Sequence, residues 1–197
     1  MNKWFPYIYD MVMLPFERTR FKGIRKALVG KAVGRFLEIG AGTGLNFPYY
    51  YQAKHVDAVD LNPLMEQHAL RRKRAALVPI ETHVVEAEAL PFADNTFDTV
   101  IATLVFCAIP NPEQAIKEIT RVSKPNAQIL LFEHVRMEQK FLGKIQDLLT
   151  PAWKKICDGC HLNRDTLTLL QRDELSIKQV DHMYNGLFLV ITVTNAK

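Results

Sequence analysis

Residues 37–47 read LEIGAGTGLNF, and this stretch decides what kind of fold the rest of the chain must complete. The apolar residues up to Ile39 are typical of a buried strand, and Gly40, Gly42 and Gly44 follow them in a G-x-G-x-G pattern. Glycine lets a strand-to-helix turn adopt positive φ and lets the backbone approach a ligand closely. A helix that begins after such a turn offers free amides and positive potential to an anionic group. We therefore expect a ligand-binding turn at the end of the first strand of an α/β sheet.

The chain around this turn alternates β-rich runs with helical patterns, which is typical of a largely parallel sheet. Helices are expected near residues 44–51, 64–77, 112–122 and 137–157, the last with a kink or break at Pro151. The expected strands cover residues 35–40, 55–61, 80–87, 97–105, 127–135, 176–184 and 187–195. Only Asn185 and Gly186 separate the last two, and this dipeptide favours a tight hairpin. The sequence predicts a Rossmann-like, doubly wound α/β fold, with a seven-stranded sheet that is mostly parallel and an antiparallel last strand formed by the C-terminal hairpin.

A carboxylate at the end of the second expected strand suggests a ligand that contains ribose. Asp60 lies 20 residues after Gly40, where it can accept hydrogen bonds from ribose hydroxyls. Both NAD and S-adenosylmethionine fit this much. The glycine spacing, the acidic Glu38 that would repel a pyrophosphate, and the terminal hairpin favour S-adenosylmethionine. An NAD-dependent oxidoreductase and a non-catalytic cofactor-binding relative remain alternatives at this point.

Four motifs between residues 35 and 135 carry a family resemblance. LEIGAGTG, VDAVDLNPLM, EAEALPFADNTFD and ITRVSKPNAQILLFEHV resemble the successive motifs of class I S-adenosylmethionine-dependent methyltransferases, especially the branch with the ubiquinone/menaquinone-biosynthesis enzymes. The chain has KPNA at 124–127 where that class usually has Lys-Pro-Gly-Gly, but Asn126 tolerates the left-handed turn conformation. The resemblance implies transfer of a methyl group from S-adenosylmethionine, with S-adenosylhomocysteine as product.

Each part of this cofactor needs a different protein partner. The glycine loop should wrap the methionine end, Glu38 should hold that loop or meet the ammonium group, and Asp60 should bind the ribose diol. Residues after the third strand should contact adenine, and residues ending the fourth should line the methyl-donor side. The expected cofactor-binding residues are Glu38, Gly40, Ala41, Gly42, Gly44, Asp60, Leu61, Glu86, Ala87, Glu88, Thr103 and Leu104.

A second, narrower resemblance covers residues 151–164, PAWKKICDGCHLNR, and the late HMYNGLFLV. These stretches resemble the methyltransferase-like seven proteins, which methylate small thiols. Those proteins begin with a hydrophobic membrane anchor, whereas residues 1–21 of this sequence are interrupted by proline and acidic residues and are not expected to form one. The two resemblances together imply a small acceptor: a thiol, or a lipid-type amine or quinone-like ring. The aromatic N-terminal segment suggests that this acceptor is hydrophobic.

In-line methyl transfer needs alignment above all, and a base only where the acceptor must lose a proton. Glu133 and His134, at the end of the fifth strand, are the candidate catalytic pair, with a structural hydrogen bond as the alternative role. Residues 1–30 should form a helical lid that brings Tyr9 to the acceptor, with an interfacial element at a lipid surface as the alternative. Residues 136–175 should form a substrate-side insertion. Its candidate substrate contacts are Asp158, His161 and Arg164.

The stretch 154–164 also contains Cys157, Cys160 and His161 in the C-x-x-C-H pattern by which c-type haem is attached. Haem attachment needs export, which the N-terminus does not suggest. A zinc site needs four ligands, and no second Cys/His cluster in the sequence is spaced to complete one, so we expect no metal. Gly159 instead predicts a turn that closes a long helix. We expect this turn to belong to a substrate lid, with a purely structural turn as the alternative.

Composition favours one domain over residues 1–197. The net charge of +4 is too small to imply a nucleic-acid partner, and no apolar run reaches the roughly 18 residues of a membrane span. The N-terminus lacks the features of a signal peptide, and three cysteines do not make a disulfide framework. We therefore expect a cytoplasmic protein whose partner is a small-molecule acceptor, with peripheral membrane contact as a less favoured alternative. The sequence leaves the oligomeric state open.

Overall fold

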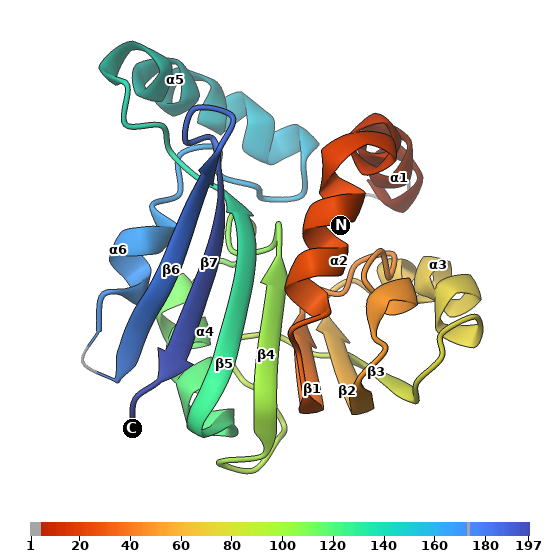
Figure 1. The fold of residues 1–197 in the computed structure, drawn as a ribbon. Coiled ribbons are helices and arrows are strands. Elements are labelled where there is room, and N and C mark those ends of the chain that lie inside the picture. Colours follow the sequence, from red (N-terminus) through yellow and green to blue (C-terminus); the bar gives the residue numbers. More distant parts are fainter. Residues whose placement is uncertain (1–4, 173) are drawn as a thin grey trace.

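The computed structural model describes residues 5–172 and 174–197 and contains a seven-stranded sheet in the order β3-β2-β1-β4-β5-β7-β6 (Figure 1). The first five strands pair in parallel, whereas β7 runs antiparallel to both of its neighbours, β5 and β6. The strands are β1 (Gly34–Ile39), β2 (Ala53–Asp60), β3 (Ile80–Val84), β4 (Phe97–Thr103), β5 (Ser123–His134), β6 (Leu175–Met183) and β7 (Phe188–Asn195). The predicted doubly wound fold with an antiparallel last strand is confirmed.

Helices cover the sheet on both faces. They are α1 (Phe5–Phe16), η1 (Glu17–Phe21), α2 (Lys22–Val29), η2 (Phe47–Tyr49), α3 (Pro63–Arg74), α4 (Pro112–Val122), α5 (Lys140–Ile156) and α6 (Thr166–Leu170). In Figure 1, α2 lies in front of the sheet and α4 behind it. Because side chains alternate along a strand, Leu130 packs in the core beneath α2, and its neighbours Ile129 and Leu131 pack in the core beneath α4. Two separate apolar layers therefore hold the sheet between the helices.

The strand order reverses between β1 and β4, and this switch point sets the position of the site. From β1 the chain proceeds outward to β2 and β3, and from β4 it proceeds the other way to β5. Ligands of open α/β sheets bind beyond the carboxyl ends of the strands at such a point. Helices α1 and α5 both lie at this edge, at the top of Figure 1.

Two expected helices differ from the prediction. Residues 44–51 form only the short 3₁₀ turn Phe47–Tyr49, because Gly44 turns with φ of +77° and Pro48 then occupies the first turn. Helix α5 starts at Lys140 and runs through Pro151 without ending there. Buried Gln146 anchors this helix, since its side-chain amide accepts from Met137 N at 2.7 Å and donates to the Leu162 carbonyl at 2.9 Å.

The C-terminal hairpin forms as predicted, but its turn is longer than two residues. Tyr184, Asn185 and Gly186 all have positive φ, and β7 begins only at Phe188. The turn closes through hydrogen bonds from Gly186 N to the Met183 carbonyl and from Leu187 N to the Tyr184 carbonyl.

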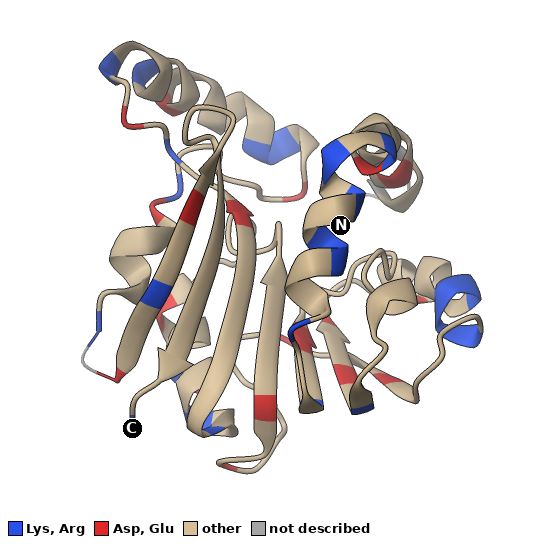
Figure 2. Cartoon of the chain, viewed as in Figure 1, with Lys and Arg blue, Asp and Glu red and all other residues tan. Residues whose placement is uncertain are grey.

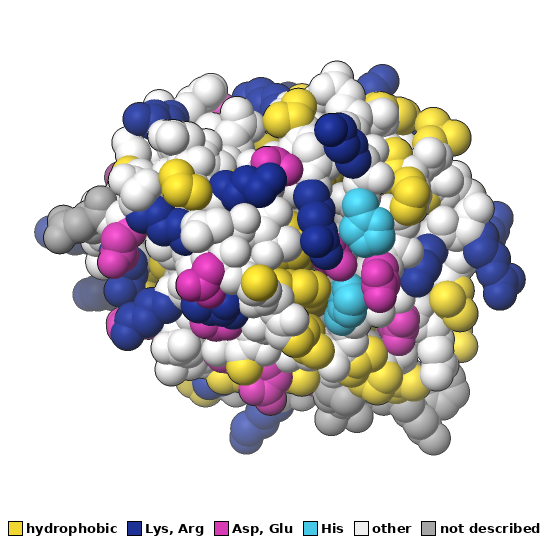
Figure 3. Space-filling view, turned by 90° about the horizontal axis from the view of Figure 1, so that it is seen from below, with side chains coloured by type: hydrophobic (Ala, Val, Ile, Leu, Met, Phe, Trp, Pro, Cys, Tyr) yellow, Lys and Arg dark blue, Asp and Glu magenta, His cyan; other side chains and the backbone are white. Residues whose placement is uncertain are grey.

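Charged side chains are distributed unevenly over the molecule. Figure 2 shows basic residues along η1 and α2, at the end of α3 and near the ends of α5. The opposite edge, at the amino ends of the parallel strands, mixes acidic, basic and histidine side chains with apolar ones (Figure 3). Within the part of the chain that the structure describes, no helix is both long and apolar enough to cross a membrane.

Candidate functional site

The glycine loop between β1 and η2 turns through positive φ, which glycine adopts at no steric cost. Gly40, Gly42 and Gly44 have φ of +66°, +57° and +77°. The Gly42 amide donates to Asp60 Oδ2 at 2.8 Å, which ties the loop to the end of β2. An added Cβ at Gly40 would overlap the side chain of Val105, so the loop after β4 lies directly against the glycine loop.

Gly40→Ala should damage the site because the new methyl group would collide with Val105 and force an unfavourable positive φ. We expect the Kd for S-adenosylhomocysteine to rise by about tenfold or more and the melting temperature to fall. Calorimetric titration and thermal melts measure the two effects. Gly23→Ala is the matched control, since a Cβ there meets nothing within 4 Å in helix α2 and alanine favours a helix by about 1 kcal/mol. Equal losses in both variants would contradict the account.

Glu38, at the end of β1, lies at the centre of a buried hydrogen-bond network. Its Oε1 accepts from Asn46 Nδ2 at 2.8 Å, and its Oε2 accepts from the Tyr50 hydroxyl at 2.8 Å. The side chain is 1% exposed, and burial raises its pKa to about 7 against the two hydrogen bonds that lower it. These contacts fix the turn from beneath, whereas a contact between Glu38 and the ammonium group of the cofactor stays a prediction.

Glu38→Gln should change how stability depends on pH. The Glu38 carboxyl has a pKa of about 7 in the folded protein and about 4.5 in the unfolded chain. Below pH 4.5 it is protonated in both states, so its ionisation does not lower the free energy of unfolding. Above that pH the unfolded chain releases its proton first, so the free energy of unfolding falls until about pH 7. The free energy of unfolding of the original protein, relative to that of Glu38→Gln, should therefore fall by on the order of 3 kcal/mol between pH 4.5 and pH 7. Urea unfolding at several pH values, with exposed Glu138→Gln as control, measures this difference, and a constant difference would contradict it.

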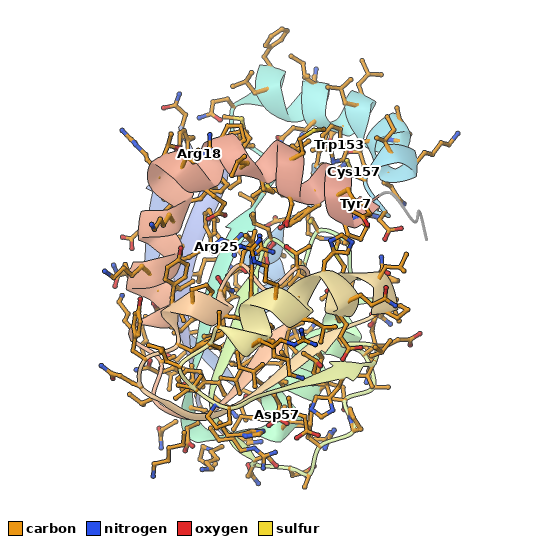
Figure 4. All side chains as sticks on the ribbon, turned by 90° about the vertical axis from the view of Figure 1, so that its right-hand side faces the viewer. Tyr7, Arg18, Arg25, Asp57, Trp153 and Cys157 are labelled. Atoms are coloured by element: carbon orange, nitrogen blue, oxygen red, sulfur yellow. The ribbon has the colours of Figure 1, made fainter. Side chains whose placement is uncertain are left out.

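Arg25 is a central residue of the site that the sequence interpretation missed. It is only 2% exposed, and Figure 4 shows it pointing inward from α2 toward the site. Its Nε donates to Glu17 Oε1 at 2.8 Å, and its NH1 donates to Asn46 Oδ1 at 3.0 Å and to Thr103 Oγ1 at 2.8 Å. In the sequence Arg25 looks like one member of a solvated basic run. The available signal is its spacing, four residues after Phe21, which places it on the buried face of the helix.

Asp60 joins the second strand to the glycine loop. Its Oδ1 accepts from Asn62 N at 2.8 Å, and its Oδ2 takes the Gly42 amide. Burial raises its pKa, the two amides oppose this rise, and the charge of Asp158 adds to it. Each carboxylate oxygen retains a further lone pair for a ligand. Leu61 is half exposed beside Asp60.

The expected adenine-side and donor-side residues fall into two groups. Glu86 is exposed and Ala87 half-buried after β3, whereas Glu88 Oε1 accepts from Asn111 N at 3.0 Å and so tethers the start of α4. Thr103 is buried at the end of β4, where its hydroxyl accepts from Arg25 and Asn46. Leu104 follows it with φ of +56°. All of them lie at or after the carboxyl ends of β3 and β4, and their contacts with a cofactor stay predictions.

Helix α1 is fastened to the glycine loop by residues outside our predicted set. Asp10 Oδ1 accepts from Thr43 Oγ1 at 2.6 Å, and Asp10 Oδ2 accepts from Arg72 NH2 at 3.0 Å. Arg72 NH1 also donates to the Thr43 carbonyl at 2.6 Å. Tyr9 precedes Asp10, and burial raises its pKa to about 12 even though the charge of Arg25 opposes this. The geometry therefore brings Tyr9 to the network under the glycine loop.

Glu133 and His134 end β5 and contact different partners. Glu133 is fully buried, and its Oε1 accepts from Val105 N at 3.0 Å and Phe106 N at 3.3 Å. His134 Nε2 lies 3.3 Å from Cys160 Sγ. No hydrogen bond between Glu133 and His134 occurs among those described. Glu133 thus has a structural contact with the next loop, and the catalytic role of the pair stays a prediction.

The turn after α5 docks onto the loop after β4. His161 N donates to the Cys107 carbonyl at 2.8 Å, and Arg164 NH2 donates to the Ile109 carbonyl at 2.9 Å. Asp158, with φ of +45°, is exposed but close enough to Asp60 to raise its pKa. The predicted turn is therefore present, and its residues lie on the same side of the sheet as the glycine loop.

Comparison with known proteins identifies the family. A model described as a methyltransferase domain matches residues 37–131. Human thiol S-methyltransferase TMT1A is 31% identical over 193 residues, which cover 92% of this chain and 79% of that protein. This chain is a class I S-adenosylmethionine-dependent methyltransferase. The expected cofactor, S-adenosylmethionine, is confirmed with the family, and the methyltransferase assignment replaces the oxidoreductase alternative.

Two further similarities concern one methyltransferase sequence and one solved structure. Phosphatidylethanolamine N-methyltransferase of Cereibacter sphaeroides is 31% identical over 118 residues, 59% of this chain and 58% of that protein. Among solved structures, a geranyl diphosphate methyltransferase in complex with S-adenosylmethionine superposes with a TM-score of 0.73 at 11% identity, covering 88% of this chain and 84% of that one. The structural likeness shows the shared fold of the methyltransferase.

Proposed function

We propose that this methyltransferase transfers the methyl group of S-adenosylmethionine to the sulfur of a small, hydrophobic thiol. The observation that carries the proposal is the position of residues 157–164, which close over the loop after β4 through the His161–Cys107 and Arg164–Ile109 hydrogen bonds. This turn lies at the edge of the sheet where ligands bind in such folds. The similarity to human thiol S-methyltransferase TMT1A spans 92% of the chain and so extends across this turn.

Apolar side chains at the same edge support a hydrophobic acceptor. Tyr7 and Met11 on α1 are 61% and 68% exposed, and Trp153 and Ile156 near the end of α5 are 39% and 67% exposed. Figure 4 shows Tyr7, Trp153 and Cys157 in the same region of the molecule, far from Asp57 at the other end of the sheet. We infer that α1 acts as the lid over the cofactor and that residues 136–175 contact the acceptor.

For the cofactor, we propose that the glycine loop wraps the methionine end and that Asp60 accepts from the ribose diol. The residues after β3 then face adenine, and Thr103 and Leu104 face the sulfonium. The buried network of Arg25, Glu38 and Asn46 supports the loop from below. The protein thereby supplies the alignment on which in-line transfer depends.

A thiol places modest demands on acid–base catalysis. Its ordinary pKa of about 8.5 leaves a few per cent as thiolate at neutral pH, whereas an ammonium group near pKa 10.4 must lose its proton first. We infer that Glu133 positions the loop through Val105 and Phe106 and does not itself take the proton of the acceptor.

Matched acceptors test this proposal. Initial rates of methyl transfer from isotopically labelled S-adenosylmethionine should be compared for 2-phenylethanethiol, 2-phenylethylamine and 4-ethylphenol; the first two differ only in the acceptor group, and the third offers a phenol of similar size. We expect the thiol to react at least about tenfold faster than the other two in kcat/KM, equivalent to about 1.4 kcal/mol in the transition state. A faster reaction with the amine or the phenol would contradict the proposal and would favour an amine or ring acceptor.

A further inference from the structure

Three potential metal ligands from separate parts of the chain meet beside the proposed acceptor site. The ligand atoms of Cys107, His134 and Cys160 all lie within 4.8 Å of one another. They come from the loop after β4, the end of β5 and the turn after α5. Because Zn–S bonds are about 2.3 Å and Zn–N bonds about 2.0 Å, ligand atoms around tetrahedral zinc lie roughly 3.3–3.8 Å apart. The observed 3.3 Å between His134 Nε2 and Cys160 Sγ is already at this spacing.

The backbone holds the segments that carry these side chains independently of any ligand. The Cys107 carbonyl accepts from His161 N at 2.8 Å, and Cys160 N donates to the Cys157 carbonyl at 2.9 Å. Glu133 fixes the start of the Cys107 loop through the amides of residues 105 and 106. The side chains can therefore approach a common ion without a change in the fold.

A second group with metal-ligand chemistry, His55, Asp57 and Glu81, differs in one decisive respect. Asp57 already accepts from Arg35 Nε at 2.9 Å and lies 3.0 Å from His83 Nε2, so positive or polar groups occupy its oxygens. In the first group, Cys160 Sγ lies 3.3 Å from the His134 ring, which is itself a member of the group, and the Cys107 thiol lies 3.8 Å from the Leu104 carbonyl. An ion that entered the group of Cys107, His134 and Cys160 would therefore not have to displace an arginine, as it would at Asp57.

We propose that Cys107, His134 and Cys160 bind one zinc ion and leave its fourth position to the sulfur of the acceptor. Two cysteines and one histidine with an open position are a ligand set of catalytic zinc. The loop that carries Cys107 packs against Gly40 through Val105, which brings the fourth position near the methyl donor. This inference rests on the proposed thiol acceptor.

The zinc ion would supply the thiolate that methyl transfer needs. On binding, the acceptor thiol releases its proton to solvent, because the thiolate is the form that coordinates a metal and acts as nucleophile. A sulfur lone pair then forms the new C–S bond. The bond between the methyl carbon and the sulfonium breaks, and its electron pair stays on the sulfur of S-adenosylhomocysteine. The product thioether is neutral and so binds zinc more weakly than the thiolate did.

Metal analysis tests the site without reference to activity. The full chain, purified without chelators, should contain about one zinc per protein by plasma mass spectrometry, and cobalt exchanged into it should give a thiolate-to-cobalt charge-transfer band. Cys107→Ser and Cys160→Ser should each lower the metal content by about tenfold or more. Cys157→Ser is the matched control, because Cys157 lies near the turn but outside the group of ligands, and it should keep its zinc. S-adenosylhomocysteine binding and thermal melts show which variants are folded.

Each outcome bears on a different part of the account. Absence of zinc in the original protein together with no cobalt band, or a Cys107–Cys160 disulfide in its place, would overturn the metal site. Addition of 2-phenylethanethiol to the cobalt protein should shift its visible spectrum, whereas 2-phenylethylamine should not. An unchanged spectrum would overturn the open position for the acceptor. Thiol methylation at an undiminished rate after zinc removal would overturn the zinc proposal and leave the thiol function standing, whereas zinc binding without thiol methylation would refute only the function.

Discussion

Asp60→Ala should weaken binding of S-adenosylhomocysteine by about 100-fold, or about 2.7 kcal/mol. The carboxylate accepts from Gly42 N and from Asn62 N, so its loss releases the glycine loop and the start of α3 at the same time. It also removes the proposed acceptor for the ribose diol. Calorimetric titration with S-adenosylhomocysteine measures the loss directly.

Two further variants sharpen this prediction. Asp60→Asn keeps one acceptor oxygen but turns an NH₂ group toward one of the two backbone amides, so its affinity should fall between those of the original protein and Asp60→Ala. Asp94→Ala is the surface control, because this side chain is 67% exposed and forms a surface ion pair with Arg121. Unchanged affinity in Asp60→Ala would refute the placement of the cofactor.

Arg25→Met should cost about 3–5 kcal/mol of unfolding free energy. Methionine fills much of the same space, but it leaves Glu17 Oε1 and Asn46 Oδ1 without the donor that now satisfies them, and it leaves Thr103 Oγ1 with Asn46 as its donor. A buried acceptor that loses its partner retains its full desolvation penalty. Because Asn46 also donates to Glu38, the loss should loosen the glycine loop and weaken cofactor binding.

Lys26→Met is the matched control for this substitution. Lys26 neighbours Arg25 on the same helix but is exposed, so its replacement should change stability by less than about 0.5 kcal/mol. Urea unfolding of both variants gives the comparison. A loss below about 1 kcal/mol in Arg25→Met would show that the network does not stabilise the fold.

The fold could be predicted from the sequence because the local patterns and the overall topology agree. The strand before Gly40, the alternation of strands and helices, and Asn185-Gly186 each pointed to the same architecture, and all seven strands formed. The errors were local. The helix expected over residues 44–51 is only a 3₁₀ turn, and of the kink or break expected at Pro151 the break is absent, because α5 continues to Ile156.

The polar contacts around the site could not be predicted as well as the fold, because they join residues far apart in sequence. Arg25 and Thr103 are 78 positions apart, and nothing in either segment signals that they meet. Asp10 and Arg72 likewise meet only once α1 folds over the glycine loop. The C-x-x-C-H stretch shows the same limit: the sulfur of Cys160 groups with the ligand atoms of Cys107 and His134, whereas Cys157, which completes the sequence pattern, is not a member of that group.

The most direct test of the thiol acceptor is an internal competition within one molecule. An apolar 2-aminoethanethiol derivative carries a thiol and a primary amine on adjacent carbons, and deuterated methyl from labelled S-adenosylmethionine marks whichever atom accepts it. Fragmentation mass spectrometry then locates the label, with a mixture that lacks the protein as the control for the uncatalysed reaction. The account predicts label on sulfur, in excess over that control. Label on nitrogen would contradict it.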